Sequence, residues 1–412
     1  MSAARAISRQ IKYKKQAPSL AEGTVPNFNQ VEREIVALNQ WPDRRITPTL
    51  RAGAEPGTVD VDLNVKDTLP LHGSVELNNR YSPNTTSLRV NGSVSYNNLW
   101  QLGHSIGASF QVAPENVRDF EVFSAYYLAR FPGLDWLSLL VQGTKQNSNV
   151  STLGSIDVAG KGEIVGAGAI LTLPPEKEYF HSLSVGFDYK HFNQQVRVGS
   201  GTIATPITYF PFTIAYSGNW IGPNFSTEIN ASLNFHFRGI GSDSAKFDNN
   251  RFKADSNYVY FRGDIAHTQD LPAGFQLYAK VQGQIADEPL INSEQFAGGG
   301  LGTVRGYLEA EVLGDNAIFG TLELRSPSLL SWLRQKGDEW RIYAFLEGGR
   351  MTLRNPLPEQ VSRNDLASYG FGSRIKVEDH LNGSIDVGIP LIGEVDTPVH
   401  DVRVIFRLWA DF

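Results

Sequence analysis

The chain contains no cysteine among its 412 residues, and it also lacks any long apolar run. Without cysteine it has neither a disulfide framework nor a cysteine-based zinc site, and it suits passage through an oxidising compartment. A spanning helix needs roughly 18 or more consecutive apolar residues, so a helical membrane protein is excluded. A transmembrane barrel is not excluded, because its strands alternate apolar and polar residues and leave no hydropathy peak.

Charge is also sparse, since only 19% of the residues are charged and the net charge is -6. This acidic balance argues against nucleic acid as a partner. The first 20 residues contain basic residues but no apolar segment, so they do not form a signal peptide. Because a barrel protein must be exported to reach the outer membrane, we expect the natural polypeptide to begin upstream of Met1.

Sequence motifs for catalysis or cofactor binding are also missing. Residues 103–107 (GHSIG) match the pattern of a hydrolase nucleophile elbow, but strand alternation continues through them and no helix follows. Asp60, Asp62 and Asn64 have the spacing of a calcium loop, yet Val65 stands where such a loop needs glycine. The histidines have no ligand spacing, and no phosphate-binding loop is present. We predict a protein that is not an enzyme and has no cofactor or metal.

Residues 1–67 differ in pattern from the rest of the chain. Residues 29–40 carry apolar side chains at helical spacing, and two extended runs, 46–53 and 58–65, flank a turn at Glu55-Pro56-Gly57. A helix followed by a pair of strands predicts a small α+β module.

From residue 71 onward the dominant pattern has period two. In residues 225–238 apolar side chains alternate strictly with polar ones, and residues 275–285 repeat the pattern. These runs reach the roughly 9 to 11 residues that a membrane-crossing strand needs. In hydrocarbon every backbone N–H and C=O must be paired, so such a sheet has to close on itself. The pattern predicts an antiparallel barrel around a wet lumen.

Sixteen such segments can be counted, and their connections alternate between short and long. They start near residues 71, 87, 103, 119, 136, 162, 181, 206, 225, 253, 274, 316, 339, 366, 381 and 402. Short periplasmic turns and longer outer loops are typical of outer-membrane barrels, and an even count places both chain ends in the periplasm. The longer connections are predicted at 146–162, 191–206, 238–253, 286–316 and 350–365. Six tryptophans support this topology, because it sorts them near the periplasmic turns, where indoles favour the bilayer interface: Trp100, Trp136, Trp220, Trp332, Trp340 and Trp409.

The last segment ends the chain on an aromatic residue. Phe406, Leu408 and Phe412 lie on its predicted lipid face, with charged residues opposite. An ordinary edge strand of this kind would leave an aggregation-prone edge. A terminal aromatic in this register resembles the C-terminal signal by which the barrel-assembly machinery recognises bacterial barrel precursors.

The connection at about 286–316 contains the most informative motif. It is unusually long for a loop, which indicates function or disorder, and it carries a glycine cluster followed by Val304, Arg305, Gly306 and Tyr307. VRGY in the connection between strands eleven and twelve of sixteen resembles the lumen-inserted loop of the two-partner secretion transporters, the ShlB/FhaC/HecB-like or TpsB family.

A second element of that family follows in strand thirteen. The family pattern Phe-x-Asp-x-Gly is matched by Phe345, Glu347 and Gly349, with glutamate in place of aspartate. Alternation turns Phe345 and Glu347 towards the lumen. The resemblance implies that Glu347 pairs with Arg305, and the longer arm of glutamate can still form a forked pair with a guanidinium.

The N-terminal module resembles the last POTRA domain of the same family, and the resemblance covers residues 20–412. We therefore expect a partial periplasmic POTRA domain at 1–67 and a 16-stranded barrel in the Gram-negative outer membrane at 68–412. The family implies nucleotide-free export of a large secreted partner, such as a haemolysin or adhesin, through the lumen, with possible activation of that partner.

Two other functions remain open at this point. A barrel-protein insertase of the same superfamily shares the POTRA modules and the VRGY loop, so these motifs do not separate it from an exporter. A passive porin shares the barrel but lacks both elements.

Overall fold

The computed structural model describes residues 18–21, 23, 25, 27, 30–31, 34–35, 38–39, 43–52, 58–131, 133–153, 156–198, 201–330, 338–378 and 380–412. No helix within these residues is long and apolar enough to cross a membrane.

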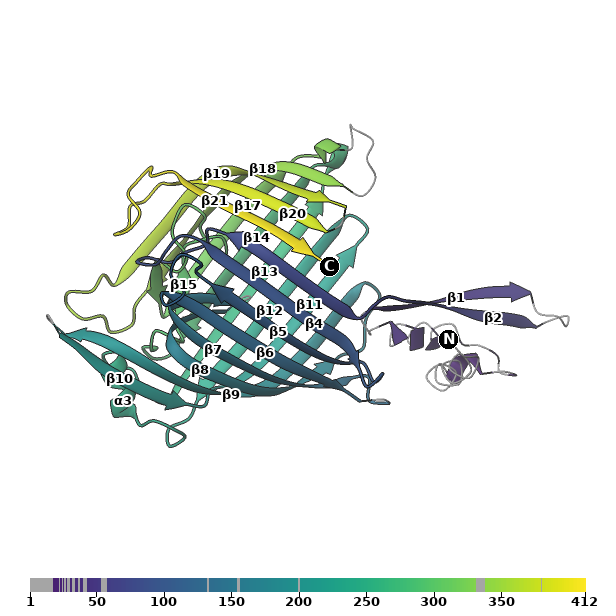
Figure 1. The fold of residues 1–412 in the computed structure, drawn as a ribbon, viewed down its shortest axis with the longest axis horizontal. Coiled ribbons are helices and arrows are strands. Elements are labelled where there is room, and N and C mark those ends of the chain that lie inside the picture. The colour runs from purple at the N-terminus through teal and green to yellow at the C-terminus, as the bar shows by residue number, and fades with distance from the viewer. Residues whose placement is uncertain are drawn as a thin grey trace.

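A closed antiparallel barrel makes up most of the chain (Figure 1). Its first half consists of β3 (Leu71–Asn78), β4 (Arg89–Leu99), β5 (His104–Val112), β6 (Phe120–Arg130), β7 (Leu137–Leu153), β8 (Ile156–Thr172), β9 (Tyr179–Val198), β10 (Gly201–Tyr209) and β11 (Phe212–Gly222). The second half consists of β12 (Phe225–His236), β13 (Tyr258–Asp270), β14 (Gln276–Ala286), β17 (Asn316–Arg325), β18 (Glu339–Thr352), β19 (Arg363–Val377), β20 (Leu381–Pro390) and β21 (Arg403–Asp411).

Strands β10 and β11 occupy one position in the ring, because both pair with β9. Strand β10 pairs with residues 190–198 of β9, and β11 pairs with residues 179–187. The barrel therefore has 16 strands, which confirms the predicted fold class. Strand β21 closes the ring against β3, from Arg407 opposite Asn78 to Asp411 opposite Ser74. Closure pairs every edge, as the absence of water in hydrocarbon requires.

Two of the predicted long loops are wrong. Strands β7 and β8 extend to Leu153 and from Ile156, and β9 and β10 extend to Val198 and from Gly201. The segments 146–162 and 191–206 are therefore largely strand. Their polar residues break the apolar alternation, which a strand needs only where one of its faces lies against lipid. The connection between β12 and β13 contains the helix α3 (Ser244–Asn250), which begins at an Asp243 cap.

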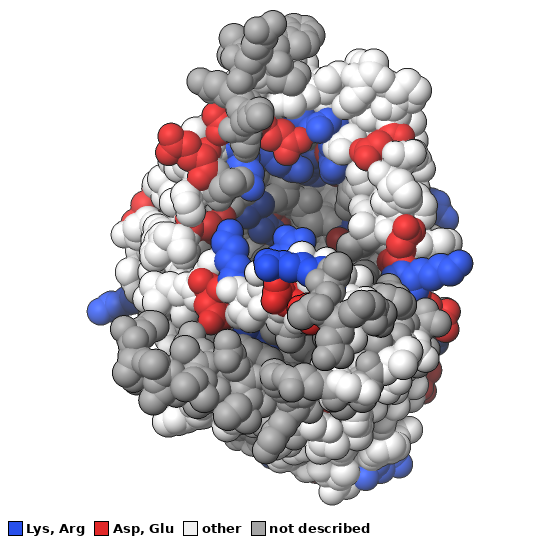
Figure 2. All heavy atoms as spheres, turned by 90° about the vertical axis from the view of Figure 1, so that its right-hand side faces the viewer, with Lys and Arg blue, Asp and Glu red and all other residues white. Residues whose placement is uncertain are grey.

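Outward and inward faces follow the alternation of the strands. On β19, Phe371 is 60% exposed, whereas Gly370 and Gly372 on either side of it are buried. Figure 2 looks into the barrel from the end that carries the N-terminal hairpin, and charged residues of both signs surround a hollow opening. The exposed apolar side chains therefore face lipid, and charged side chains gather around the mouth of the lumen.

The tryptophans fit the predicted belt only in part. Trp100, Trp136 and Trp220 are exposed near the turns. Trp409 belongs to the inward face, where the guanidinium of Arg407 lies 4.7 Å from its ring centre. Trp332 lies outside the described residues.

The N-terminal region contains a hairpin that projects from one end of the barrel (Figure 1). Strand β1 (Arg44–Ala52) pairs along its whole length with β2 (Val59–Asp67). The described residues of the predicted helix pack on this hairpin through Leu38 and Ile46, beside a 3-10 turn at Pro18–Leu20. The hairpin confirms the two predicted strands, while the assignment to a POTRA domain stays a prediction.

The outward face leads to a test. Ile265 is 53% exposed and lies between Ile229 and Val281 on neighbouring strands. We expect Ile265→Lys to lower the free energy of unfolding in lipid vesicles by about 2–4 kcal/mol, because the bilayer interior cannot solvate an ammonium. Urea titration followed by tryptophan fluorescence measures it. The matched variant Asn230→Lys places its charge in the lumen opposite Asp264, and its expected cost is below about 1 kcal/mol. Equal losses would contradict the assignment of faces.

Candidate functional site

The connection between β14 and β17, residues 287–315, folds into the barrel and is called the inner loop below. Most of its side chains from Leu290 to Asp315 are buried. A surface loop would expose most of them to water. Its short hairpin, β15 (Phe296–Gly298) with β16 (Val312–Gly314), lies within the outline of the barrel in Figure 1.

Glycines let the inner loop turn sharply beyond β15. Gly299 and Gly300 have φ angles of 104° and 81°, which residues with a Cβ atom rarely adopt. The Thr303 hydroxyl accepts a hydrogen bond from the Gly299 N–H at 2.8 Å and donates one to the Gly299 carbonyl at 3.0 Å. The turn brings residues 304–307 against the strands that follow in sequence.

Arg305 is the centre of the site and is only 4% exposed. Its Nε donates to Glu347 Oε1 on β18 at 2.8 Å, and its backbone N–H donates to Glu347 Oε2 at 2.7 Å. The same guanidinium reaches Glu323 on β17 at 2.9 Å and Asp386 on β20 at 2.8 Å. Its plane also lies over the Phe345 ring, 3.6 Å from the ring centre. One side chain thus ties the inner loop to three strands.

The charges around Arg305 leave it firmly protonated. Burial alone would lower the pKa of its guanidinium, but the Glu347, Glu323 and Asp386 carboxylates raise that pKa instead. Glu323 also accepts from Arg325 at 2.7 Å, and Asp386 accepts from the Tyr343 hydroxyl at 2.8 Å. Without Arg305, the buried carboxylates of Glu323, Glu347 and Asp386 would repel one another. The loop needs these carboxylates to hold Arg305, and the carboxylates need Arg305 to neutralise their charge.

The other motif residues of the loop fit against the wall closely. Val304 and Tyr307 are fully buried, and the Tyr307 hydroxyl donates to the Ile392 carbonyl at 2.7 Å. A Cβ atom on Gly306 would lie 2.7 Å from Ser368 Cβ, so only glycine allows this approach.

The strand motif predicted at Phe345, Glu347 and Gly349 meets this loop. Phe345 and Glu347 both contact Arg305 as described. Gly349 faces the Phe319 ring, and a Cβ there would come within 2.3 Å of it. Phe319 in turn packs in a buried cluster with Val304 and other loop residues. Gly349 therefore makes room for the loop rather than touching Arg305.

The predicted C-terminal signal lies elsewhere. Leu408 and Phe412 are exposed on the outward face, and Phe406 is half-buried there. The backbone of Phe412 exchanges hydrogen bonds with Gly73 on β3, and its ring covers that glycine. These residues belong to the seam of the barrel and not to the loop site.

Sequence reasoning missed two of the three carboxylates that hold Arg305. Glu323 and Asp386 stand alone on strands that carry no family motif, so only the register identifies them. A usable signal existed, because alternation turns both towards the lumen between outward residues such as Leu322 and Ile385.

The inner loop has a second anchor on a different wall, at Glu294. Its carboxylate accepts from Lys190 Nζ at 2.7 Å, from the Tyr209 hydroxyl at 2.6 Å and from the Tyr260 hydroxyl at 2.8 Å. Burial alone would raise the pKa of the Glu294 carboxyl, but Lys190 and the two hydroxyls outweigh burial and hold it below its usual range. Leu290 packs nearby in an apolar cluster with both tyrosines.

A third anchor joins the end of the loop to the segment after β3. Arg80 Nε donates to Glu309 Oε1 at 2.8 Å, and the Leu301 N–H reaches the same oxygen at 3.1 Å. The Glu309 N–H also donates to the Tyr81 carbonyl at 3.1 Å. The inner loop is therefore held by β9, β10 and β13 near its start, by β17, β18 and β20 at its tip, and beside β3 near its end.

The second anchor gives a prediction. We expect Glu294→Gln to lower the free energy of unfolding by about 3 kcal/mol, because the Lys190 ammonium loses the carboxylate to which it donates. Since the pKa of Glu294 is depressed by folding, the wild-type contribution is full above pH 4.5 and is lost as the pH falls further. Urea titrations at neutral and acidic pH measure both effects. Glu163→Gln, in an exposed pair with Lys145, should cost below about 1 kcal/mol. Equal costs would contradict the anchor.

Comparison with known proteins adds independent findings. A family model described as haemolysin secretion/activation protein ShlB/FhaC/HecB matches residues 57–375. The heme/hemopexin transporter protein HuxB of Haemophilus influenzae (strain 86-028NP) is 23% identical over 287 residues, which are 68% of this chain and 49% of HuxB. The outer membrane transporter CdiB of Dickeya dadantii is 22% identical over 335 residues, 74% of this chain and 54% of CdiB. The chain thus spans about half the length of these relatives.

Two solved structures share the fold. CdiB from Escherichia coli superposes with a TM-score of 0.76 and 18% identity, covering 98% of this chain and 74% of that one. BamA from Haemophilus ducreyi, lacking POTRA domains 1-3, superposes with a TM-score of 0.62 and 12% identity, covering 97% and 82%. These likenesses establish the architecture.

The family match covers most of the barrel. The family consists of transporters, which agrees with the prediction that the chain is not an enzyme. The closed barrel, its apolar outward face and the family match all indicate a protein of the outer membrane. The chain is an outer-membrane β-barrel and belongs to the ShlB/FhaC/HecB family of haemolysin secretion/activation proteins.

Proposed function

We propose that this chain exports a secreted partner protein across the outer membrane, through the barrel lumen and without nucleotide. The observation that supports it most is the set of ion pairs from Arg305 to Glu323, Glu347 and Asp386, called the Arg305 clamp below. It holds a loop inside the lumen of a barrel of this family. A loop held there by a cluster of charges narrows the resting lumen without sealing it permanently.

The proposed mechanism needs no site for chemical energy. An extended partner chain enters from the periplasm, passes the inner loop and folds outside the cell. Folding outside removes the chain from the equilibrium and so gives the movement its direction. The partner is a large secreted protein such as a haemolysin or an adhesin.

The N-terminal hairpin is the proposed docking element. We assign residues 1–67 to a partial POTRA domain in the periplasm and residues 68–412 to the barrel. A hairpin offers edge strands to which an extended segment of the partner adds by backbone hydrogen bonds. Leu50, Val59 and Val65 are exposed on it and offer apolar contacts.

Phe406, Leu408 and Phe412 are the proposed signal for the barrel-assembly machinery. They lie on the outward face of the strand that closes the ring, where an insertion factor reaches them before closure.

The insertase alternative shares the architecture, as the likeness to BamA illustrates. The family match favours export over insertion. The porin alternative is disfavoured by the anchored inner loop, which occupies part of the lumen that a porin keeps open.

The clamp gives the central prediction. We expect Arg305→Ala to reduce secretion of the partner at least about tenfold, because the orphaned carboxylates cost about 3–5 kcal/mol and release the loop tip. Immunoblots of partner in the medium and the periplasm measure it, and heat-modifiable migration on gels reports barrel assembly. Arg238→Ala, which removes an exposed ion pair with Asp255, should leave secretion unchanged. Normal secretion by Arg305→Ala would contradict the proposed role of the clamp in export.

Export itself has a separate test. We expect the gene beside this one to encode a very large secreted protein rich in repeats, and its product should accumulate in the periplasm when this chain is deleted. Loss of other barrel proteins on deletion would favour the insertase instead. A large open conductance of the purified chain without any partner would favour the porin.

A further inference from the structure

The lumen has two chemically different walls. The strands that hold the tip of the inner loop carry many inward charges, among them Glu323, Glu347 and Asp386. On the opposite strands, β4–β8, the inward face carries Arg89 and Arg130 near strand ends. Between these ends the inward face has no charged residue in the described segments 91–97, 105–111, 122–128, 140–146 and 162–168. We call this inward face the uncharged wall.

The orientation of the uncharged wall follows from its outward neighbours. Val94, Ile106, Phe123, Val141 and Val165 are all exposed on the lipid side. Because side chains alternate along a strand, the serine, threonine, asparagine, glutamine and glycine residues between them face the lumen. The same face also carries a few apolar or aromatic residues: Val122, Tyr126, Leu128, Leu140 and Ile164. Charged residues of these segments, such as Lys145 and Glu163, pair with each other on the outward side.

Hydroxyl groups run across this wall in one row. Strand register places Ser74, Ser93, Ser109, Ser124 and Thr144 opposite one another on five consecutive strands. The Ser74 and Ser93 hydroxyls are 2.7 Å apart, and the Ser124 and Thr144 hydroxyls are 2.9 Å apart. Each hydroxyl can donate and accept a hydrogen bond.

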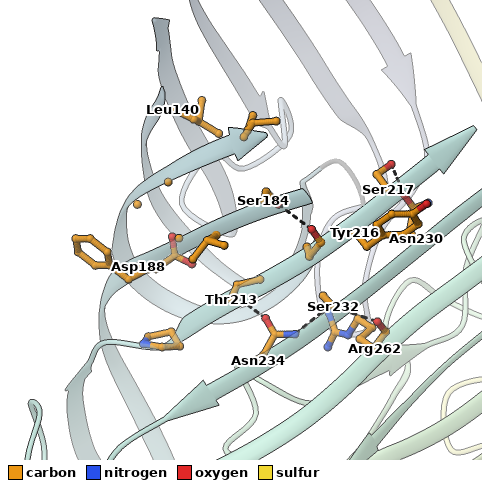
Figure 3. A pocket seen from close by; sticks show the side chains of 18 of the residues that line it. Leu140, Ser184, Asp188, Thr213, Tyr216, Ser217, Asn230, Ser232, Asn234 and Arg262 are labelled. Carbon is orange, nitrogen blue, oxygen red and sulfur yellow. Dashed lines mark hydrogen bonds between the residues drawn. The ribbon is translucent and has the colours of Figure 1, made fainter. Parts of the chain in front are cut away.

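The row leads round the barrel to a hollow of about 510 Å³. Figure 3 shows its lining, in which Ser217 bonds to Asn230 and Thr213 bonds to Asn234. Away from β8 the lining also carries charged side chains: Asp188, Lys190, Arg262, Asp264 and Glu294. Gly166 on β8 also lines it and brings no side chain into the space. The hollow borders the second anchor, since Glu294 forms part of its lining.

The inner loop is held mainly by strands other than those of the uncharged wall, although Ile164 of β8 packs against the apolar cluster that contains Leu290 and Ile291. Its ion pairs and hydrogen bonds described above reach β9, β10, β13, β17, β18, β20 and the segment after β3. Gln282 on β14 adds one more, to the Gly302 carbonyl at 2.6 Å. None of these ion pairs and hydrogen bonds lies on β4–β8.

Resting on the export function proposed above, we propose that the uncharged wall is the track along which an extended segment of the secreted partner moves. A chain in transit carries unpaired backbone N–H and C=O groups, which need partners away from bulk water. Hydroxyl and amide side chains supply both donors and acceptors, so one hydrogen bond replaces another at each step. Fixed charges would hold oppositely charged segments and repel the others.

The absence of native cysteine makes the test direct. Ser109→Cys on β5 lies on the track, and Lys280→Cys on β14 lies eight strand positions away in the ring, also facing the lumen. Each variant is placed in lipid vesicles with an unstructured peptide of serine, glycine and asparagine that carries one cysteine, and the thiols are oxidised. We expect about fivefold more peptide adduct with Ser109→Cys than with Lys280→Cys, as a modest difference in local affinity gives.

A small charged thiol reagent serves as control and must modify both cysteines in vesicles without peptide. Equal adducts, more adduct at Lys280→Cys, or no adduct at either accessible cysteine would overturn the track. Such a result leaves export untouched if cells carrying the unaltered chain still secrete the partner, whereas failed secretion by those cells removes export itself.

Discussion

Closure of the sheet is the constraint on which the rest of this molecule depends. In hydrocarbon a strand edge without partners is too costly, so β21 must return to β3 and the sheet acquires an inside. Once an inside exists, period two along each strand sorts every residue to lipid or to lumen. The same polar residues that would be ordinary on a soluble sheet then become the lining of a conduit, and the long connection after β14 can fold into it.

The inner loop is held by charge in a space that is neither bulk water nor protein core. Arg305 is shared among carboxylates of three strands, and Glu294 and Glu309 each meet a cation from another part of the barrel. Buried ion pairs of this kind add little net stability compared with apolar packing, but they are costly to break singly. Such contacts suit a loop that must hold one position at rest and still be displaced as a unit.

Much of the fold could be predicted from alternation, because lipid on one side imposes a pattern that survives without any peak in hydropathy. The wrong predictions concern residues outside the part of the strands that lipid surrounds, or residues near its edge. Beyond the bilayer β7–β10 continue as strands with polar faces, and Trp409 lies on the inward face although its position along the strand suggested the interface. At the site, Arg305 and Glu347 could be paired from motifs. The contacts of Glu323, Asp386 and Lys190 with the inner loop could not be predicted, because they depend on which strands the loop lies against.

From the amino-acid pattern alone one could predict the ring of sixteen strands, the two faces of each strand, and the two motifs that meet in the lumen. These follow from local periodicity and from residue types that few other structures use together. The position of the inner loop, the set of carboxylates that share Arg305, and the uncharged middle of the wall formed by β4–β8 could be read only from the folded barrel. Those features depend on contacts between residues far apart in the chain, and spacing along a strand carries no information about what stands across the barrel.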